Sequence, residues 1–367
     1  MKYKYHLFFL IFLPLLCSCQ DDENKSSRNT DKINLPEGFH IETYAADIPN
    51  ARAMVLADDG TLFAGSRSEG KVYAVTSGKR DVIVLDENIS SPAGVDLHDG
   101  DLYVSAVSKI LKYPDILNQL EDPPKPVVIT NQYPDNPSHG WKFIKFGPDG
   151  KLYVPVGAPC NICLSQDSIF ASLTRINKDG SNMEVIAHGI RNTVGFDWHP
   201  ETGVLWFTEN GRDNMGDYVP PDEINKLTVI DQHFGYPYVH GDSITDPQFW
   251  QQRPQGFDWQ KPEVKLEAHV AALGMRFYTK EMFPQQYHHG IFFAEHGSWN
   301  RTEKIGYRVM FVPVNNGVAG QKQVFASGWL QGEDYWGRPA DVEVMKDGSL
   351  LVSDDYAGTI YRIYYKP

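Results

Sequence analysis

The best candidate for a catalytic base in this sequence is His139, which lies directly before a run of alternating apolar residues. The segment from His139 to Gly157 reads HGWKFIKFGPDGKLYVPVG, so the histidine stands at the entrance to a predicted strand, where loops gather and side chains meet ligands. An imidazole with its ordinary pKa of about 6.5 can take a proton in general-base catalysis. A lone histidine is more often a surface residue than a base, so this hypothesis depends on the groups around it.

Two further polar segments lie between predicted strands. Residues 188–195 (HGIRNTVG) contain Arg191 and Asn192, and a guanidinium fork beside a carboxamide suits a planar anionic ligand, although an ordinary surface arginine gives the same pattern. Residues 208–217 (TENGRDNMGD) are rich in oxygen donors of the kind that a hard cation such as Ca²⁺ binds. They lack EF-hand spacing, and simple loop chemistry gives the same composition.

The last polar group consists of two C-terminal segments that each place an arginine near a tryptophan. They are residues 295–301 (EHGSWNR), with Arg301, and residues 335–341 (YWGRPAD), with Arg338. Together with Arg191, these arginines predict a multiply anionic ligand, because their mutual repulsion at one mouth otherwise has no compensation. No Ser/His/Asp triad, glycine-rich phosphate loop or Walker pattern occurs in a credible context, so hydride chemistry would need a cofactor.

The elements that must position these residues follow from a repeated unit, which is an apolar segment, a turn built on Asp-Gly or its equivalent, and an apolar strand. Apolar residues with period two on both sides of such a turn predict a β-hairpin. The unit occurs at residues 54–63, 94–104, 144–154, 196–207, 287–294 (a degenerate copy) and 342–352. Turn-to-turn spacings of about 40 to 90 residues, with a third strand after several copies, predict a radial array of sheets.

The sequence therefore predicts an all-β fold, a six-bladed β-propeller of four-stranded antiparallel blades. The segment Phe39–Ala45 (FHIETYA) would be the strand that closes the last blade. A β-sandwich or a β-helix is the alternative, and both fit the evenly spaced hairpins less well.

The N-terminus has the features of an export signal. Lys2 and Lys4 precede an apolar run at residues 7–16, which is too short to span a bilayer but suits a secretory signal. The sequence Leu-Cys-Ser-Cys at residues 16–19 resembles a bacterial lipobox, so we expect Cys19 to become the lipid-modified first residue of a lipoprotein. The alternative is an ordinary signal peptide that is cleaved nearby.

The chain is thereby divided into a signal peptide at residues 1–18, a flexible polar tether at 19–35 and a folded domain at 36–367. We expect an exported protein that is lipid-anchored in the bacterial cell envelope, in the periplasm or at the outer membrane. The formal charge of −13, without a long basic run, argues against nucleic acid and against an anionic membrane surface as partners. Membrane contact is expected through the lipid anchor only, and a neutral substrate fits the overall charge better.

Two cysteines remain in the folded domain, at Cys160 and Cys163. In an oxidising compartment this close pair is more typical of a disulfide than of half a zinc site, because no second Cys/His pair completes four ligands. Leu164 follows where a c-type haem motif requires a histidine, which excludes covalent haem.

Five motifs occur together in the order found in the glucose/sorbosone dehydrogenase family, and the chain resembles this family over about residues 36–365. These are His-x7-Gly-Pro-Asp-Gly-x-Leu-Tyr-Val from His139, Gly-Ile-Arg-Asn-x-x-Gly from Gly189, Asp-Glu-Ile-Asn from Asp222, His-Gly-Ser-Trp-Asn-Arg from His296 and Gly-Arg-Pro-x-Asp from Gly337. The family consists of six-bladed propellers that use pyrroloquinoline quinone (PQQ), and the sequence looks closest to its sorbosone and pyranose dehydrogenase branch. The Cys160 and Cys163 pair also looks like that branch.

The resemblance implies roles for particular residues. His139 falls on the general base, and Arg191 and Asn192 fall on the pair that contacts the quinone. The remaining matches concern the cofactor and its metal. Gly211 and Arg212 fall on the two residues whose backbone carbonyls hold Ca²⁺, and Arg338 falls on an arginine that binds a cofactor carboxylate. Asn300 or Arg301 falls on the position of a cofactor-binding lysine in the glucose-oxidising branch.

The sequence also departs from the family pattern. Ala340 stands where the glucose-oxidising branch has a second arginine, Val194 where it has a glutamine, and Ser138 where an acid can precede the base. These departures bear on substrate preference and on the affinity for PQQ.

The activity implied by the resemblance is oxidation of a sugar hemiacetal to its lactone, or of a sorbosone-like aldehyde to an acid. His139 would take the hydroxyl proton while hydride passes to PQQ, and the electrons would continue to a membrane quinone or a cytochrome. The alternative is a propeller without redox activity, either a Ca²⁺-dependent lactonase-like hydrolase or a carbohydrate-binding protein. A hydrolase of that kind would show acidic side-chain ligands converging on the axis, whereas the dehydrogenase would show main-chain carbonyls and arginines around a wide pocket.

Overall fold

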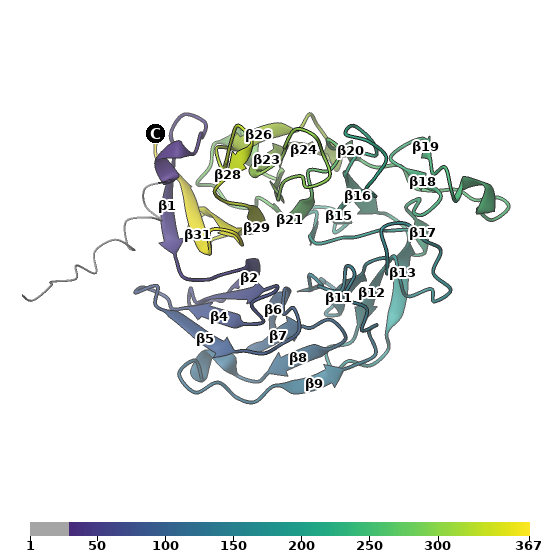
Figure 1. The fold of residues 1–367 in the computed structure, drawn as a ribbon. Coiled ribbons are helices and arrows are strands. Elements are labelled where there is room, and N and C mark those ends of the chain that lie inside the picture. The colour runs from purple at the N-terminus through teal and green to yellow at the C-terminus, as the bar shows by residue number, and fades with distance from the viewer. Residues whose placement is uncertain (1–28) are drawn as a thin grey trace, which may run out of the picture.

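The computed structural model describes residues 29–367. The predicted signal peptide at residues 1–18, the predicted lipid attachment at Cys19 and the first part of the predicted tether lie outside the described residues. The six large sheets are arranged around a common centre, as Figure 1 shows, with one edge strand of each sheet innermost. The predicted six-bladed propeller is therefore confirmed.

The first three blades follow one another along the chain, and each is an antiparallel sheet in sequence order. Blade 1 comprises β2 Ala51–Leu56, β3 Leu62–Ser66, β4 Val72–Val75 and β5 Val82–Asp86; blade 2 comprises β6 Val95–His98, β7 Asp101–Ser105, β8 Ile110–Tyr113 and β9 Val127–Thr130; blade 3 comprises β10 Lys145–Phe146, β11 Leu152–Val156, β12 Ser172–Ile176 and β13 Glu184–His188. Blade 3 also carries a fifth strand at its outer edge, because β17 (Gln232–His233) pairs with β13 in parallel.

The remaining three blades contain longer insertions. Blade 4 comprises β14 Phe196–Trp198, β15 Leu205–Glu209, β16 Glu223–Leu227 and β20 Val264–Lys265; blade 5 comprises β21 Ala272–Phe277, β22 Ile291–Glu295, β23 Arg308–Val312 and β26 Gln323–Ala326; blade 6 comprises β29 Pro339–Val344, β30 Leu350–Asp354, β31 Thr359–Tyr365 and β1 Phe39–Ala45.

Short elements complete the described part of the chain. Three small hairpins are formed by β18 Val239–His240 with β19 Ile244–Thr245, by β24 Val314–Asn315 with β25 Val318–Ala319, and by β27 Leu330–Gln331 with β28 Asp334–Tyr335. The helical elements of residues 29–367 are single 3₁₀ turns at η1 Thr30–Lys32, η2 Ile116–Asn118, η3 Trp250–Gln252 and η4 Gln285–Tyr287. No helix in this part of the chain is long and apolar enough to cross a membrane.

The Asp-Gly turns form because the aspartate satisfies the backbone that the turn exposes. In the hairpin between β10 and β11, the Asp149 Oδ1 accepts a hydrogen bond from the Lys151 N–H (3.1 Å), and Gly150 adopts a φ of 72° that side chains rarely tolerate. The Asp347 carboxylate accepts the Ser349 N–H (2.9 Å) in the equivalent turn of blade 6.

Adjacent blades are joined at the centre by carboxylates on inner strands. The Asp341 Oδ2 of blade 6 accepts the Met54 N–H of blade 1 (2.8 Å). The same contact recurs from Asp96 of blade 2 to Phe146 of blade 3 (2.6 Å). These carboxylates are buried, and burial raises the pKa of Asp96 and of Asp341 to about 6. The backbone donors that they accept stabilise them and fix the inner strands relative to one another.

The ring is closed by the N-terminal strand, as predicted. Strand β1 pairs antiparallel with β31, with Phe39 opposite Tyr365, so the first and last strands of the described chain share one blade. The Phe39 ring packs edge-on against Phe283 and Phe325, with ring centroids 4.8 and 5.1 Å apart. The closing strand therefore buries an aromatic anchor between blades 5 and 6.

The chain before Pro36 is also attached to the propeller. Asn34 forms a reciprocal backbone bridge with Ser327, with N···O distances of 2.7 and 3.1 Å. Ile33 and Leu35 pack against the aromatic cluster of blades 5 and 6. The folded region thus reaches back into the described end of the predicted tether, because its apolar residues find a surface to cover.

We expect Phe39→Ala to lower the free energy of unfolding by about 3–5 kcal/mol, because the ring is only 8% exposed and its removal leaves a cavity at the closure of the ring. The measurement is urea unfolding followed by tryptophan fluorescence. Val84→Ala, at a side chain of β5 that is 46% exposed, is the control and should change little. Equal destabilisation by the two variants would contradict the anchoring role of Phe39.

Candidate active site

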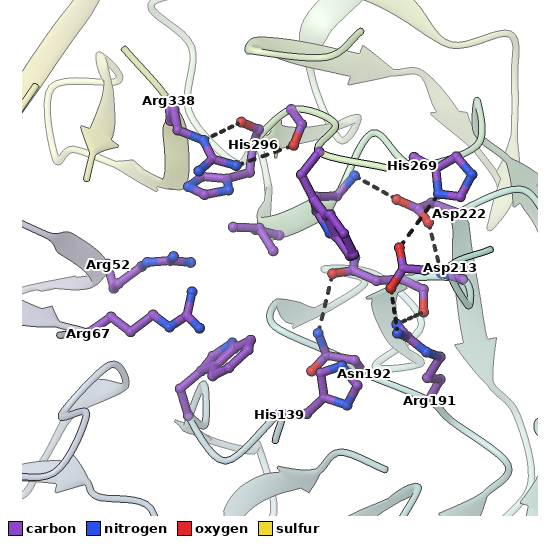
Figure 2. Close-up of a pocket in the computed structure, with 17 residues that line it drawn as sticks. Arg52, Arg67, His139, Arg191, Asn192, Asp213, Asp222, His269, His296 and Arg338 are labelled. Carbon is purple, nitrogen blue, oxygen red and sulfur yellow. Dashed lines mark hydrogen bonds and ion pairs between the residues drawn. The ribbon is translucent and has the colours of Figure 1, made fainter. Parts of the chain in front are cut away.

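A cavity of about 370 Å³ opens at the centre of the propeller, at the end where the inner strands begin and the second strands of the blades end (Figure 2). Its wall is built from loops of blades 1, 3, 4, 5 and 6. The lining residues are Arg52, Arg67, His139, Trp141, Arg191, Asn192, Asn210, Gly211, Asp213, Asp222, His269, Ala271, Leu273, His296, Gly297, Trp299 and Arg338.

The structure brings five of the predicted site residues to this cavity, namely His139, Arg191, Asn192, Gly211 and Arg338. The predicted Asn300 and Arg301 do not line it. Asn300 donates to Asn214 Oδ1 (3.1 Å), and Arg301 donates to two backbone carbonyls and lies over the Tyr218 ring, 5.0 Å from its centroid. The segment that carries them reaches the cavity through His296, Gly297 and Trp299.

His139 is held in one tautomer by the backbone. Its Nδ1 lies 2.8 Å from the carbonyl oxygen of Ala158, which can only accept, so Nδ1 carries the proton and Nε2 keeps a free lone pair. The close packing is possible because residue 157 is glycine: a Cβ there would lie 2.4 Å from the His139 Cβ. Burial, assisted by the positive charge of Arg191, lowers the pKa of His139 to about 4. The imidazole is thus a neutral acceptor facing the cavity.

Arg191 joins three loops and is 5% exposed. Its Nε and Nη2 donate to the backbone and side-chain oxygens of Asn161 (2.8 and 2.9 Å), and its guanidinium pairs with Asp213 at 3.2 Å. Asn161 lies between Cys160 and Cys163, which the structure joins in a disulfide. Arg191 therefore fixes the disulfide loop to the loop after β15 while it lines the cavity.

Asn192 and Asn210 are linked to each other across blades 3 and 4. The Asn192 Nδ2 donates to Asn210 Oδ1 (3.3 Å), and the Asn210 N–H donates to the Asn192 carbonyl (3.0 Å). Asn210 also donates to the carbonyl of Ala272 at the start of blade 5 (2.6 Å). This chain of amides sets the spacing of three blades at the wall of the cavity.

The segment at 211–212 presents main-chain oxygens. The backbone carbonyls of Gly211 and Arg212 accept no hydrogen bond from the described residues. The Arg212 side chain is directed elsewhere, since it pairs with buried Asp246 at 2.6 Å. Asp222 holds the segment by accepting the Gly211 N–H (2.8 Å) and the Ala271 N–H (2.7 Å), and burial raises the pKa of Asp222 to about 7.

Within residues 29–367, no group of three or more His, Cys, Asp or Glu side chains lies close enough together to hold a metal ion. The main-chain carbonyls at 211–212 are oxygen atoms of the kind that a hard cation prefers.

Two arginines of blade 1 at this cavity, Arg52 and Arg67, escaped the sequence analysis. Arg52 pairs with Asp355 at 2.8 Å, and Asp355 also contacts His296 Nε2 at 2.9 Å. Burial lowers the pKa of His296 to about 4, whereas Arg52 and His296 hold the pKa of Asp355 well below its usual range. Arg67 could have been found from its position, because it directly follows the second strand of its blade, as Asn210 follows β15.

Two of the three departures from the family pattern lie together. Val194 and Ala340 form an apolar cluster with Leu273, against which Trp141 packs. Val194 and Ala340 also line a small void that adjoins the main cavity and that Arg52 borders. The substitutions thus replace polar groups by an apolar surface beside the site.

Comparisons with known proteins agree with this architecture. The family model described as glucose/sorbosone dehydrogenase matches residues 118–362. An uncharacterized protein of Borreliella burgdorferi is 33% identical over 351 residues, with 92% of each chain covered.

Two solved structures share the fold at low identity. The holo form of the pyranose dehydrogenase PQQ domain from Coprinopsis cinerea has a TM-score of 0.75 at 18% identity, with 90% of this chain and 97% of that chain covered. The PQQ-bound aldose sugar dehydrogenase from Streptomyces coelicolor has a TM-score of 0.65 at 19% identity, with 90% and 99% covered. Because the family model spans more than half of the chain, and its motifs converge on one cavity, the chain belongs to the glucose/sorbosone dehydrogenase family.

Proposed function

We propose that this protein is a PQQ-dependent quinoprotein that oxidises a sugar hemiacetal to a lactone, or an aldehyde to an acid, with His139 as the general base. The observation that carries the proposal is the tautomer of His139. Its Nδ1–H donates to Ala158, which leaves Nε2 free to accept a proton from a hydroxyl group in a cavity walled by arginines.

The residues present fit a bound PQQ with Ca²⁺. The Arg338 guanidinium donates only to the carbonyls of His296 and Gly297, at 3.2 and 3.3 Å, so it has no carboxylate partner among the described residues. The Arg52 Nε is buried without a hydrogen-bond acceptor. The carbonyls of Gly211 and Arg212 are unused oxygen donors. Arg338 would hold a cofactor carboxylate, and the two carbonyls would hold the metal.

When bound, PQQ would supply an ortho-quinone that accepts two electrons, and Ca²⁺ would act on it as a Lewis acid. The protein's own contribution is to place a neutral imidazole beside the substrate hydroxyl and to receive its proton at Nε2. Trp299, which is 73% exposed at the cavity, offers a ring face on which a sugar can stack.

The same arrangement favours a dehydrogenase over a lactonase-like hydrolase. The cavity presents guanidinium groups and main-chain carbonyls, which are the groups expected at the site of a dehydrogenase. Export and lipid attachment at Cys19, proposed from residues outside the described part, would place the enzyme in the cell envelope. There a membrane quinone or a cytochrome is a suitable electron acceptor.

The proposed function is tested with the mature protein without its lipid anchor. PQQ and Ca²⁺ are added, PQQ binding is followed by equilibrium dialysis, and reduction of an artificial dye is assayed with a panel of aldoses and ketoaldehydes. We expect binding at micromolar PQQ and substrate-dependent dye reduction. Absence of PQQ binding at these concentrations would overturn the proposal.

We expect His139→Ala to lower kcat by about 10²- to 10⁴-fold, the usual contribution of a general base, while PQQ remains bound. Steady-state dye reduction and equilibrium dialysis measure the two effects. His289→Ala is a matched control, because His289 pairs with Glu201 on an exposed surface. Equal activity of the wild type and His139→Ala would refute the assignment of the base.

The pH dependence of kcat/KM should report the environment of His139. Burial and Arg191 lower the pKa of His139 to about 4, so the proton-accepting form predominates above that value and is lost as the pH falls through it. We expect a level profile from neutral pH down to about pH 5 and a decline below it. An acid limb centred at or above the ordinary pKa of about 6.5 would contradict the structure.

We expect Arg338→Gln to weaken PQQ binding by about 10- to 100-fold, because a charge-assisted hydrogen bond contributes about 1.5–3 kcal/mol. The dissociation constant is measured by equilibrium dialysis in the presence of Ca²⁺. Arg301→Gln, outside the cavity, should leave that constant within about threefold of the wild type. An unchanged affinity in Arg338→Gln would remove Arg338 from the cofactor site.

A further inference from the structure

Arg67 is a charged group at the cavity without a polar partner. Its guanidinium lies over the Trp141 ring, 3.8 Å from the ring centroid, and forms no hydrogen bond or ion pair with any described residue. The other arginines of the wall differ in this respect, since Arg191 pairs with Asp213 and Arg52 pairs with Asp355. A stacked guanidinium keeps its N–H donors at the ring edge available for a ligand.

The wall formed by blade 1 carries an excess positive charge. Arg52 repels Arg67, and the carboxylate of Asp355 acts on both. His296, which also contacts Asp355, is neutral near pH 7 because burial lowers its pKa to about 4. Burial, with repulsion from Arg52, lowers the pKa of Arg67 to about 10, so Arg67 remains protonated but poorly solvated. A bound anion would relieve both effects.

This charge lies beside the proposed base. Figure 2 shows Arg52 and Arg67 pointing into the cavity from the same side, with His139 nearby. Trp141, on which Arg67 stacks, lies 5.9 Å from the His139 ring, centroid to centroid. The charge of Arg67 also contributes to the lowered pKa of His139. An anionic group held by Arg67 would therefore be close to the atom that His139 deprotonates.

We propose that Arg67 binds a carboxylate of the substrate, and that the substrates are anionic aldoses of the uronic acid class. This inference rests on the proposed function and narrows it. It also replaces the expectation of a neutral substrate, because the charge of −13 is a property of the whole chain, whereas the cavity wall is locally cationic.

The reaction remains an oxidation at the anomeric carbon. The C1–H bond would break, and the quinone cofactor, when bound, would be the oxidant that takes up the hydride and its two electrons. The C1 hydroxyl loses its proton to His139 Nε2, and the C1–O bond becomes the carbonyl of a lactone. The substrate carboxylate at Arg67 does not react and serves only to bind and orient the sugar.

The test compares uronic acids with the matched neutral sugars on the holoenzyme, as glucuronate against glucose and galacturonate against galactose. We expect the wild type to favour the uronic acid by at least about tenfold in kcat/KM. Arg67→Gln should lower kcat/KM for the uronic acid by about 10- to 100-fold more than it lowers the value for the matched neutral sugar. The preference should also decline as NaCl is raised.

Arg253→Gln is the matched control, because Arg253 stacks on Trp250 at the same distance of 3.8 Å but lies outside the cavity. The preference of Arg253→Gln for the uronic acid over the neutral sugar should equal that of the wild type. A wild type that shows no preference for the uronic acid, or an Arg67→Gln variant that keeps it, would overturn the proposal. Circular dichroism melts of both variants establish that each is folded before the kinetics are compared.

A binding experiment separates the substrate from the cofactor as the source of the carboxylate. We expect Arg67→Gln to bind PQQ with Ca²⁺ as the wild type does, within about threefold. If the variant loses PQQ affinity and keeps the uronic acid preference, the anion belongs to the cofactor and the proposal is wrong. Calorimetry with glucuronate on protein without PQQ gives a readout that is independent of activity. Binding there, lost in Arg67→Gln, would support the anion site even if PQQ binding failed.

Discussion

The geometry of the site depends on buried or half-buried carboxylates at the places where inner strands of neighbouring blades meet. Asp341 accepts a backbone N–H across the junction of blades 6 and 1, Asp96 across that of blades 2 and 3, and Asp197 across that of blades 4 and 5, where the Phe277 N–H donates at 3.0 Å. A buried carboxylate without such a donor would be strongly destabilising, so each junction has one favoured register. Since the cavity wall is assembled from loops of five blades, its dimensions are inherited from these junctions.

Positive charge is distributed unevenly along the propeller axis. Arg276, on the inner strand β21, pairs with both Asp341 and Glu343 and is fully compensated, so it acts as part of the core. At the cavity, by contrast, the guanidinium of Arg338 donates only to carbonyls, and that of Arg67 stacks on a ring without an ion pair to any described residue. Arginines that pair with a carboxylate of the chain stabilise the fold, whereas arginines without such a partner can bind an anionic ligand. This difference distinguishes the site from its scaffold.

Much of the fold could be predicted because its determinants are local. The Asp-Gly turns and the alternation around them mark each hairpin, and the repetition of hairpins gives the number of blades. The closing role of Phe39–Ala45 could be predicted for the same reason, since a surplus strand at one end implies an incomplete blade at the other. What the chain before Pro36 does could not be seen, because Ile33 and Leu35 dock on a surface that exists only once blades 5 and 6 have assembled.

The site was predictable where a motif set the backbone and not where the direction of a side chain mattered. His139, Arg191 and Arg338 were found from their segments, but the neighbours Trp299, Asn300 and Arg301 could not be sorted. Their spacing does not tell which one faces inward. In blade 1, Arg52 lies within an apolar strand and Arg67 at a strand end, and neither belongs to a recognisable motif.

The positions of the arginines in the cavity connect the departure at Ala340 with the proposed substrate. At Ala340 this chain lacks an arginine that the glucose-oxidising branch carries on blade 6, and Arg52 of blade 1 borders the void that Ala340 lines. Arg52 therefore lies beside the void at Ala340, but the charge of Arg52 is already balanced by Asp355. Arg67, in contrast, forms no ion pair with any described residue, and Asp355 acts on it only without direct contact. Because Arg67 stands beside the base and forms no ion pair with a carboxylate of the described chain, the proposed substrate carboxylate would supply its counterion.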